Sequence, residues 1–341
     1  MGSDWLTQGP PIEEFEEAVC ERVGAEYAVA YSSATAGLHG AGAAAGLTPD
    51  SHLVTSSLSF IASANVGGYM GSRVSFADLD LDTMNLDLDL VARDADVVVP
   101  VHYAGLPVDL SGIERSACVV IEDAAHAIGA LTPHGPVGNC ANSDMTVFSF
   151  HPVKTVTSGE GGVVTTNNAD LAEFLRRFRH HGIERVDGAP AWHYTIPELA
   201  FNYRMTGLQA ALGQNQLRHL DSFLERRIAI ADVYDAAFAD SVVVTPPRPL
   251  AGFTHGLHLY VIRVPHRRFV FDFLRSQNIG VQVHYVPIHH HGPYLSDDAG
   301  LPNTMATYES IISLPLFPTL TGQEQDRVVA TVLTALRMAE S

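Results

Sequence analysis

The sequence is poor in cationic side chains. Of its 341 residues, 20 are lysine or arginine and 38 are aspartate or glutamate, which gives a formal net charge of −18. The overall field of such a protein does not attract nucleic acid or an anionic membrane surface, so neither is an expected partner. Any anionic ligand must therefore be held by a local group of donors.

Cysteine and long apolar runs are also scarce. Cys20, Cys118 and Cys140 are odd in number and stand in no CxxC spacing, so neither a disulfide framework nor a zinc cluster is expected. No apolar run approaches the roughly 20 residues that cross a bilayer. The chain does not open with a basic stretch followed by an apolar segment, as a secretory signal would. The expected location is the reducing cytoplasm.

Apolar side chains are plentiful, because hydrophobic residues make up 46% of the chain and charged residues 17%. Short β-branched runs occur at residues 27–31, 52–55, 73–76, 96–101, 118–122, 146–150 and 162–166. Helix-length, alanine-rich segments such as 35–45 and 60–69 lie between them. This alternation predicts an α/β fold with a mainly parallel sheet covered by helices.

The helical segments suggest where the chain divides. An opening helix is expected to begin near Pro11 and to end at Gly24. A long helical stretch from about Thr206 to Ala237 is expected to connect a large domain, residues 1–220, to a small C-terminal α+β domain, residues 221–341. Strands are expected in the small domain at 257–264 and 281–285.

Polar loops after the predicted strands are the candidate ligand sites, because ligands of an open parallel sheet bind at the carboxyl ends of its strands. The first loop, Ser32 to Gly37, directly precedes a helix. Its backbone N–H groups and hydroxyls would suit a phosphate. An ordinary serine or threonine N-cap explains the same residues equally well.

The second loop runs from Glu122 to His126 and contains Asp123 at the end of a strand. A carboxylate there can hold a protonated ring nitrogen, which is the partner that pyridoxal phosphate (PLP) requires as an electron sink. Taken alone, a helix N-cap aspartate is the commoner explanation of this residue.

The third stretch runs from Ser149 through Lys154 to Gly161 and Gly162. A lone lysine is usually a solvated surface charge. This one lies between a β-run and a glycine-rich turn in a chain with few cations, so it is expected to point into the cleft that the two domains would form. A desolvated lysine loses its proton readily and can form a Schiff base with an aldehyde, which is the chemistry that PLP needs.

The order of these parts is more specific than any one of them. The chain closely resembles the DegT/StrS family of PLP-dependent sugar aminotransferases in the motifs WLTQGP, SSATAGLH, SFIASAN, VIEDAAHAIGA, FSFHPVKTVTSGEGG and FNYRMTGLQAALG. The resemblance extends from Trp5 to at least Leu217, and more loosely to VQVHYVPI at Val281 to Ile288. It implies a fold-type I PLP-dependent transferase.

The resemblance also implies a role for each matched residue. Lys154 would hold the cofactor as a Schiff base and move a proton at the substrate carbon, Asp123 would pair with the ring nitrogen, and His126 would lie near the phenolic oxygen. The remaining roles are Phe60 on the ring face, Ala34, Thr35 and Ser149 at the phosphate, Asn202 at the phosphate of a neighbouring subunit, and Glu160, Arg204, His284 and Tyr285 at the substrate. A homodimer with shared active sites follows. Phe60 could instead be an ordinary core aromatic.

A finer likeness predicts the substrate class. HPVKTVTSGEGG, HHGIERV and VHYVPIHHHGPY look most like the aminotransferases of pseudaminic acid synthesis, which convert a UDP-linked 4-keto-6-deoxy-HexNAc to its 4-amino form with glutamate as donor. The alternatives are another keto sugar or a cyclitol as acceptor, or a PLP-binding or sugar-nucleotide-binding protein that does not turn over.

Two segments rich in basic residues are further candidate binding sites. The cations between Arg176 and Arg185 could meet the pyrophosphate of a sugar nucleotide, or they could simply favour a helix C-terminus. His284 and the run His289 to His291 invite a metal interpretation. Three adjacent histidines do not easily converge on one ion and no carboxylate stands at ligand spacing, so no metal site is predicted.

Overall fold

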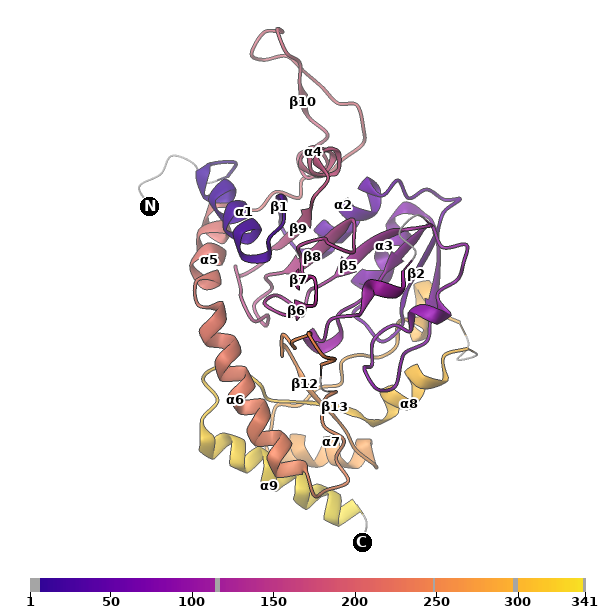
Figure 1. Ribbon diagram of the computed structural model, residues 1–341, viewed down its shortest axis with the longest axis vertical. Helices are drawn as coiled ribbons and strands as arrows, with labels where there is room; N and C mark the ends of the chain where they lie inside the picture. Colours follow the sequence, from indigo (N-terminus) through magenta and orange to yellow (C-terminus); the bar gives the residue numbers. More distant parts are fainter. Residues whose placement is uncertain (1–6, 114–116, 248, 297–299, 340–341) are drawn as a thin grey trace.

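The computed structural model describes residues 7–113, 117–247, 249–296 and 300–339. A large sheet with its helices occupies the upper part of Figure 1, and helices surround a small two-stranded sheet in the lower part. Trp5 and Leu6 of the WLTQGP motif lie outside the described residues.

Seven strands form the large sheet, in the order β1-β9-β8-β5-β4-β2-β3. They are β1 (Tyr27–Tyr31), β2 (His52–Ser56), β3 (Arg73–Ala77), β4 (Val97–Val99), β5 (Val119–Asp123), β8 (Met145–Ser149) and β9 (Gly162–Thr166). Neighbouring strands from β8 to β3 are parallel, whereas β9 is antiparallel to both β1 and β8. The prediction of a mainly parallel sheet is confirmed.

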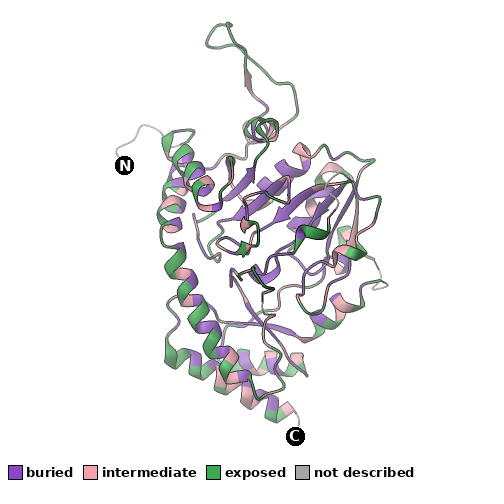
Figure 2. Ribbon diagram, in the orientation of Figure 1, coloured by how far each residue is buried: buried purple, intermediate pink, exposed green. Residues whose placement is uncertain are grey.

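Both faces of this sheet are buried, and alternate residues serve opposite faces (Figure 2). In β1, for example, Ala28 and Ala30 pack on one side and Val29 and Tyr31 on the other. The helices α2 (Ala34–Ala44), α3 (Ala62–Met70) and α4 (Ala169–Phe178) cover one face, and α1 (Pro10–Val23) and α5 (Gly207–Leu217) cover the other. Burial on both faces explains why several strands are continuously apolar.

The predicted opening helix is confirmed. Pro11 lies in the first turn of α1, and Gly24 ends it at φ +77°, a left-handed conformation that glycine adopts without steric cost. The predicted helical stretch from about Thr206 to Ala237 is confirmed, but it consists of two helices, α5 and α6 (Leu220–Phe238), rather than a continuous one. Thr206 and Gln209 form a capping box that starts α5, and the chain then departs from helical geometry at His219 before α6 begins.

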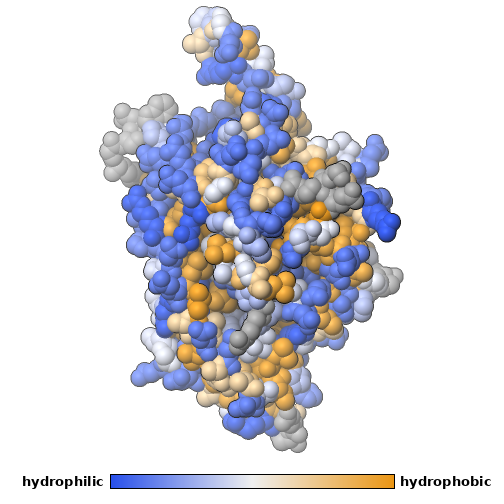
Figure 3. Space-filling model, viewed as in Figure 1, coloured by the Kyte–Doolittle hydropathy of each residue, from blue (hydrophilic) through white to orange (hydrophobic). Residues whose placement is uncertain are grey.

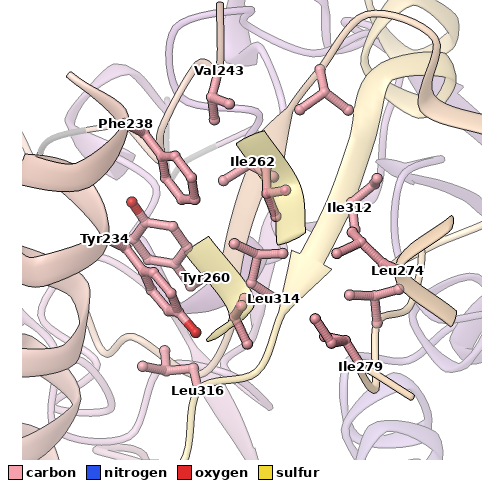
Figure 4. Packing of buried hydrophobic residues seen from close by; sticks show 14 of the residues in the cluster. Tyr234, Phe238, Val243, Tyr260, Ile262, Leu274, Ile279, Ile312, Leu314 and Leu316 are labelled. Atoms are coloured by element: carbon pink, nitrogen blue, oxygen red, sulfur yellow. The ribbon is translucent and has the colours of Figure 1, made fainter. Parts of the chain in front are cut away.

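The C-terminal part forms its own apolar cluster, shown in Figure 4. Its elements are α6, β12 (Tyr260–Arg263), α7 (Arg267–Ser276), α8 (Pro302–Ser310), β13 (Ile311–Leu314) and α9 (Gly322–Ala339). The strand predicted at 281–285 is wrong, because β12 pairs with β13 and only an isolated bridge joins Gln282 to Ser313. The domain boundary at residue 220 stays a prediction.

A narrow arm, residues 183–200, projects from the body beyond α4 (Figures 1 and 3). It carries the short strands β10 (Glu184–Arg185) and β11 (Tyr194–Thr195). The other short elements are β6 (Leu131–Thr132), β7 (Gly135–Pro136), and 3-10 turns at Leu88–Leu90, Tyr103–Gly105, Leu110–Gly112, Ile288–His290 and Gly292–Tyr294. Within the described ranges, none of the helices combines the length and the apolar character needed to span a membrane.

Candidate active site

A cavity of about 380 Å³ lies where the carboxyl ends of β1, β5 and β8 meet a segment from the C-terminal part. All of the predicted site residues except Asn202 and Arg204 line it. The lining is Ser33, Ala34, Thr35, Leu38, Ser59, Phe60, Ala62, Val101, Asp123, Ala125, His126, Ser149, His151, Val153, Lys154, Glu160, His284 and Tyr285. The strand-end position expected for a parallel sheet is therefore confirmed.

One end of the cavity is the start of α2. The Ser33 hydroxyl caps this helix by accepting a hydrogen bond of 3.1 Å from the Ala36 amide, so the N-cap interpretation of the loop is confirmed. The amides of Ala34 and Thr35 follow in the first turn, where N–H groups have no intrahelical partner. Together with the Ser149 hydroxyl across the cavity, they form a donor set suited to a phosphate.

Gly162 makes this end of the cavity possible. A Cβ atom at Gly162 would lie 2.5 Å from the amide nitrogen of Ala34 and from the carbonyl group of Ser33. Only a residue without a side chain lets β9 approach the helix start so closely.

Asp123 ends β5 and is 5% exposed. One carboxylate oxygen accepts from the Ala125 amide at 3.1 Å, and the other accepts from the Ser63 hydroxyl at 2.7 Å. Ser63 is itself 2.9 Å from the Ser59 hydroxyl. The carboxylate is thus held in one orientation. Sequence reasoning missed Ser63, although it lies within the SFIASAN motif.

Lys154 lines the same cavity as Asp123. Loss of solvation lowers the pKa of the Lys154 amine from 10.5 to about 8, although the Asp123 carboxylate opposes this shift. About a tenth of the amine is therefore uncharged at pH 7, far more than for an ordinary lysine, and the uncharged form is the nucleophile for an aldehyde. Lys154 is also the only lysine in the sequence, a signal that sequence reasoning overlooked.

Aromatic and imidazole rings form the wall beside Lys154. Phe60 is 55% exposed and its ring lies 6.0 Å from that of Tyr285, so its interpretation as a core aromatic is wrong. Nε2 of His126 is 3.2 Å from the Tyr285 hydroxyl, and Nδ1 of His284 is 2.8 Å from the Ser313 hydroxyl. Burial first, and then the charge of Lys154, lowers the pKa of His126 well below 6.5 and that of His284 to about 4. Both imidazoles are neutral at pH 7.

At the rim, His151 and Glu160 face each other at 3.8 Å. Of the histidine run at 289–291, His289 is buried outside this cavity, and its Nδ1 is 2.6 Å from the Ser57 hydroxyl. Within the described residues, no three His, Cys, Asp or Glu side chains are grouped as metal ligands.

Asn202 and Arg204 lie away from this cavity, at the base of the arm. Arg204 lines a second cavity of about 340 Å³ with Arg176, Arg177, Arg179 and His180. Nη1 of Arg204 is 2.7 Å from Nδ1 of His180. The other cations are partly committed: Arg177 pairs with Glu198 at 3.0 Å, Arg179 pairs with Glu16, and Arg176 and Arg177 lie in the last turn of α4.

Comparison with known proteins identifies the family. A model of the DegT/DnrJ/EryC1/StrS aminotransferase family matches residues 1–333. This chain belongs to that family. It is 33% identical to the spore coat polysaccharide biosynthesis protein SpsC of Bacillus subtilis, over 100% of this chain and 93% of that protein.

Solved structures agree. The putative sugar aminotransferase Spr1654 from Streptococcus pneumoniae, in its PMP form, superposes with a TM-score of 0.92 and 27% identity, covering 98% of this chain and 94% of that one. Helicobacter pylori PseC, an aminotransferase involved in the biosynthesis of pseudoaminic acid, superposes with a TM-score of 0.90 and 30% identity, with the same coverage. This family member is thus a PLP-dependent sugar aminotransferase.

The cavity fits that cofactor. It offers an amine of lowered pKa for an aldehyde, a fixed carboxylate for a ring nitrogen, an exposed aromatic ring for stacking, and a helix start with hydroxyls for a phosphate. The aldehyde, the ring nitrogen, the ring face and the phosphate of PLP thus each have a counterpart of the right chemical type on the cavity wall.

Proposed function

We propose that the protein transfers an amino group from glutamate to the C4 keto carbon of a nucleotide-linked 4-keto-6-deoxy sugar. The observation that carries the proposal is that Lys154, the only lysine of the chain, lines one cavity with the fixed carboxylate of Asp123. The likeness to PseC supports an amino sugar of the pseudaminic acid type, and the likeness to SpsC supports polysaccharide synthesis. The cytoplasm remains the expected location.

In this proposal the cavity residues divide the work of holding PLP. Ala34, Thr35 and Ser149 bind its phosphate, Asp123 binds the ring nitrogen, and Phe60 packs on the ring. When bound, PLP supplies an electron sink for the carbon from which a proton is removed. The negative charge of Asp123 favours the protonated ring nitrogen, and Ser63 and Ala125 hold its carboxylate in one orientation.

Lys154 holds the cofactor and then acts as the base at the substrate carbon. Its amine has a pKa of about 8, close enough to neutral pH to accept and return a proton. In this proposal the neutral His126 lies beside the cofactor, near its phenolic oxygen, and its Nε2 is 3.2 Å from the Tyr285 hydroxyl on the same cavity wall. We assign substrate contacts to His284, Tyr285 and Glu160, which line the same cavity.

A second copy of the chain is proposed to complete each site. Arg204 and His180 form a cationic cavity that contains no lysine, so it is not a catalytic site by itself. The adjoining arm carries exposed apolar side chains, with Trp192 at 80% and Leu199 at 88%. Such side chains mark a protein interface. In a homodimer, Asn202 and Arg204 would reach the partner's cavity and meet the phosphate and the anionic groups of the substrates.

Chemical labelling tests the cofactor site directly. Incubation with PLP followed by borohydride reduction should leave a stable adduct on the peptide that contains Lys154. The variant Lys154→Met has no side-chain amine, so only the N-terminal amine could react, and peptide mapping distinguishes the two. An unmodified Lys154 peptide in the wild-type protein would contradict the proposal.

A panel of nucleotide-linked keto sugars and keto cyclitols, assayed with glutamate, tests the acceptor. We expect formation of 2-oxoglutarate with a 4-keto-6-deoxy-HexNAc nucleotide and little or none with 3-keto sugars or cyclitols. Turnover only with one of the latter would change the substrate class and keep the aminotransferase. A Lys154 adduct without any turnover would identify a binding protein.

A further inference from the structure

His258 lies directly behind His126, on the side of the active-site wall that faces the C-terminal part. It belongs to the segment between α6 and β12 and is 6% exposed. The two imidazole rings are 4.4 Å apart between centroids and tilted by 42°. His258 does not line the cavity, so any effect on the reaction must act through His126.

Buried polar atoms without hydrogen-bond partners gather at this place. Among the described residues, the buried side-chain atoms that lack a partner are His126 Nδ1, His258 Nδ1, Arg227 Nε and Thr307 Oγ1. The first three belong to one group of neighbours. Native proteins pair nearly all buried polar atoms, so such a concentration calls for a functional explanation.

The position of His258 is fixed by its own backbone. Nη1 of Arg227 donates to the carbonyl oxygens of Leu257 at 3.0 Å and His258 at 3.2 Å. The His258 amide donates to the Ala104 carbonyl at 3.0 Å, which ties the segment to the large sheet's loops. Gly105 packs closely between the backbones of His126 and Leu257, because a Cβ on Gly105 would lie 2.7 Å from the His126 carbonyl oxygen and 2.9 Å from the Leu257 amide.

The charges around the pair favour uncharged rings. Burial, and then the cation of Lys154, lowers the pKa of both imidazoles, and Arg227 adds to the effect on His258. No hydrogen bond joins the two rings, so their contact is through ring packing. A rigidly held neutral ring can therefore limit the orientations open to its neighbour without competing for the hydrogen bond between His126 and Tyr285.

We infer that His258 is a positioning residue that holds the His126 ring in its orientation on the cofactor side of the wall. The inference rests on the proposed function, which places His126 beside the cofactor. His126 is a catalytic-site residue in that proposal, and His258 acts only by restricting its movement.

A double-mutant cycle tests this dependence. We expect His258→Ala to lower kcat about tenfold in the wild-type background, because misplacement of a site residue is costly. In the His126→Ala background the same change should alter kcat less than about twofold, because the residue that it positions is gone. Equal losses in both backgrounds would overturn the inference.

The absorbance of bound PLP gives a second readout that general destabilisation would not move. The absorbance of bound PLP is followed as pH is varied, and the pH at which half of the change has occurred is the midpoint. This midpoint should shift in the same direction in His258→Ala, in His126→Ala and in the double variant. His52→Gln is the control. His52 is also buried, and its replacement removes ring contacts to Ser75 and Asp94. However, His52 is the first residue of β2, at the opposite end of the parallel strands from the carboxyl ends that line the cavity. Its midpoint should not change.

If His258→Ala fails to fold, His258→Asn takes its place in the same cycle. An unshifted midpoint in the His258 variants, with a normal Lys154 adduct in the wild-type protein, overturns this inference alone. Absence of the Lys154 adduct in the wild-type protein overturns the proposed function and this inference with it.

Discussion

Asp123 is oriented by a serine that sequence patterns do not single out. Its carboxylate accepts one hydrogen bond from the Ser63 hydroxyl and one from the Ala125 amide, and it lies almost completely buried. A hydrogen bond to a charged group contributes about 1.5–3 kcal/mol, so the Ser63 hydroxyl is a substantial part of the site's preorganisation.

Ser63→Ala should therefore weaken PLP binding by about tenfold or more, given this energy range. The reason is that the carboxylate loses a donor and can turn away from the ring nitrogen. Equilibrium titration of the apo protein with PLP, followed by absorbance, measures the change. Ser72→Ala serves as control, because Ser72 donates to the Thr48 carbonyl on the exposed side of the molecule. Equal affinities in Ser63→Ala and the wild-type protein would refute the role.

Lys154 should also make the stability of the apo protein depend on pH. In the folded chain its pKa is about 8, whereas an unfolded lysine keeps its proton up to about 10.5. Between these values unfolding takes up a proton, so rising pH stabilises the folded state. Relative to Lys154→Met, the wild-type protein should gain at most about 3 kcal/mol from pH 7 to pH 11.

Urea unfolding of both proteins across this range isolates the effect, because all other titrating groups are shared. A stability difference that is constant with pH would show that Lys154 keeps an ordinary pKa. A difference that falls as pH rises would show that its proton is bound more tightly in the folded chain.

The contact between β9 and the start of α2 shows how one strand shapes a phosphate site. β9 begins at Gly162, and its backbone lies against the Ser33 carbonyl and the Ala34 amide. Because β9 is paired on both sides, with β1 and with β8, it cannot move away to make room for a side chain.

Gly162→Ala should destabilise the protein by about 1–3 kcal/mol, the usual cost of overpacking. It should also weaken PLP binding more than this loss of stability explains, because the amides of Ala34 and Thr35 are displaced. Gly280→Ala is a matched control, since a Cβ there meets no atom within 4 Å. Thermal unfolding and PLP titration measure both effects. A normal PLP affinity in Gly162→Ala would argue against the phosphate position.

The complete molecule in solution is expected to be a dimer. The arm projects from the body (Figure 3) and exposes large apolar side chains. The cationic cavity at its base is separate from the cavity that contains the lysine. Both features are explained if the arm of one chain packs against the other chain and its base borders the partner's cavity.

Subunit complementation tests this arrangement. Lys154→Ala and Asn202→Ala should each be inactive alone. Mixed dimers formed by co-expression contain one site with both native residues and one site with neither. Random pairing makes about half of the dimers mixed, so about a quarter of the wild-type activity should return. Inactivity of the mixture, with dimers present by ultracentrifugation, would mean that each site is built from one chain. A monomer would rule out sharing altogether.

What the sequence alone determined was local and periodic. The β-branched runs predicted the seven strands of the large sheet, because strand and turn preferences act over a few residues. The same patterns placed Asp123 at the end of one strand and Lys154 in the loop after another. Ordered motifs then identified the family. The lone lysine was present in the sequence as well and makes Lys154 unambiguous.

Tertiary structure decided every question of which distant segments meet. The pairing of β12 with β13 left 281–285 without a ladder, and the turn at Arg218 and His219 divided the predicted helical stretch into α5 and α6. The contacts of Ser63 with Asp123 and of His258 with His126 join residues 60 and 132 positions apart. Such contacts depend on how whole elements pack, and no local preference encodes them.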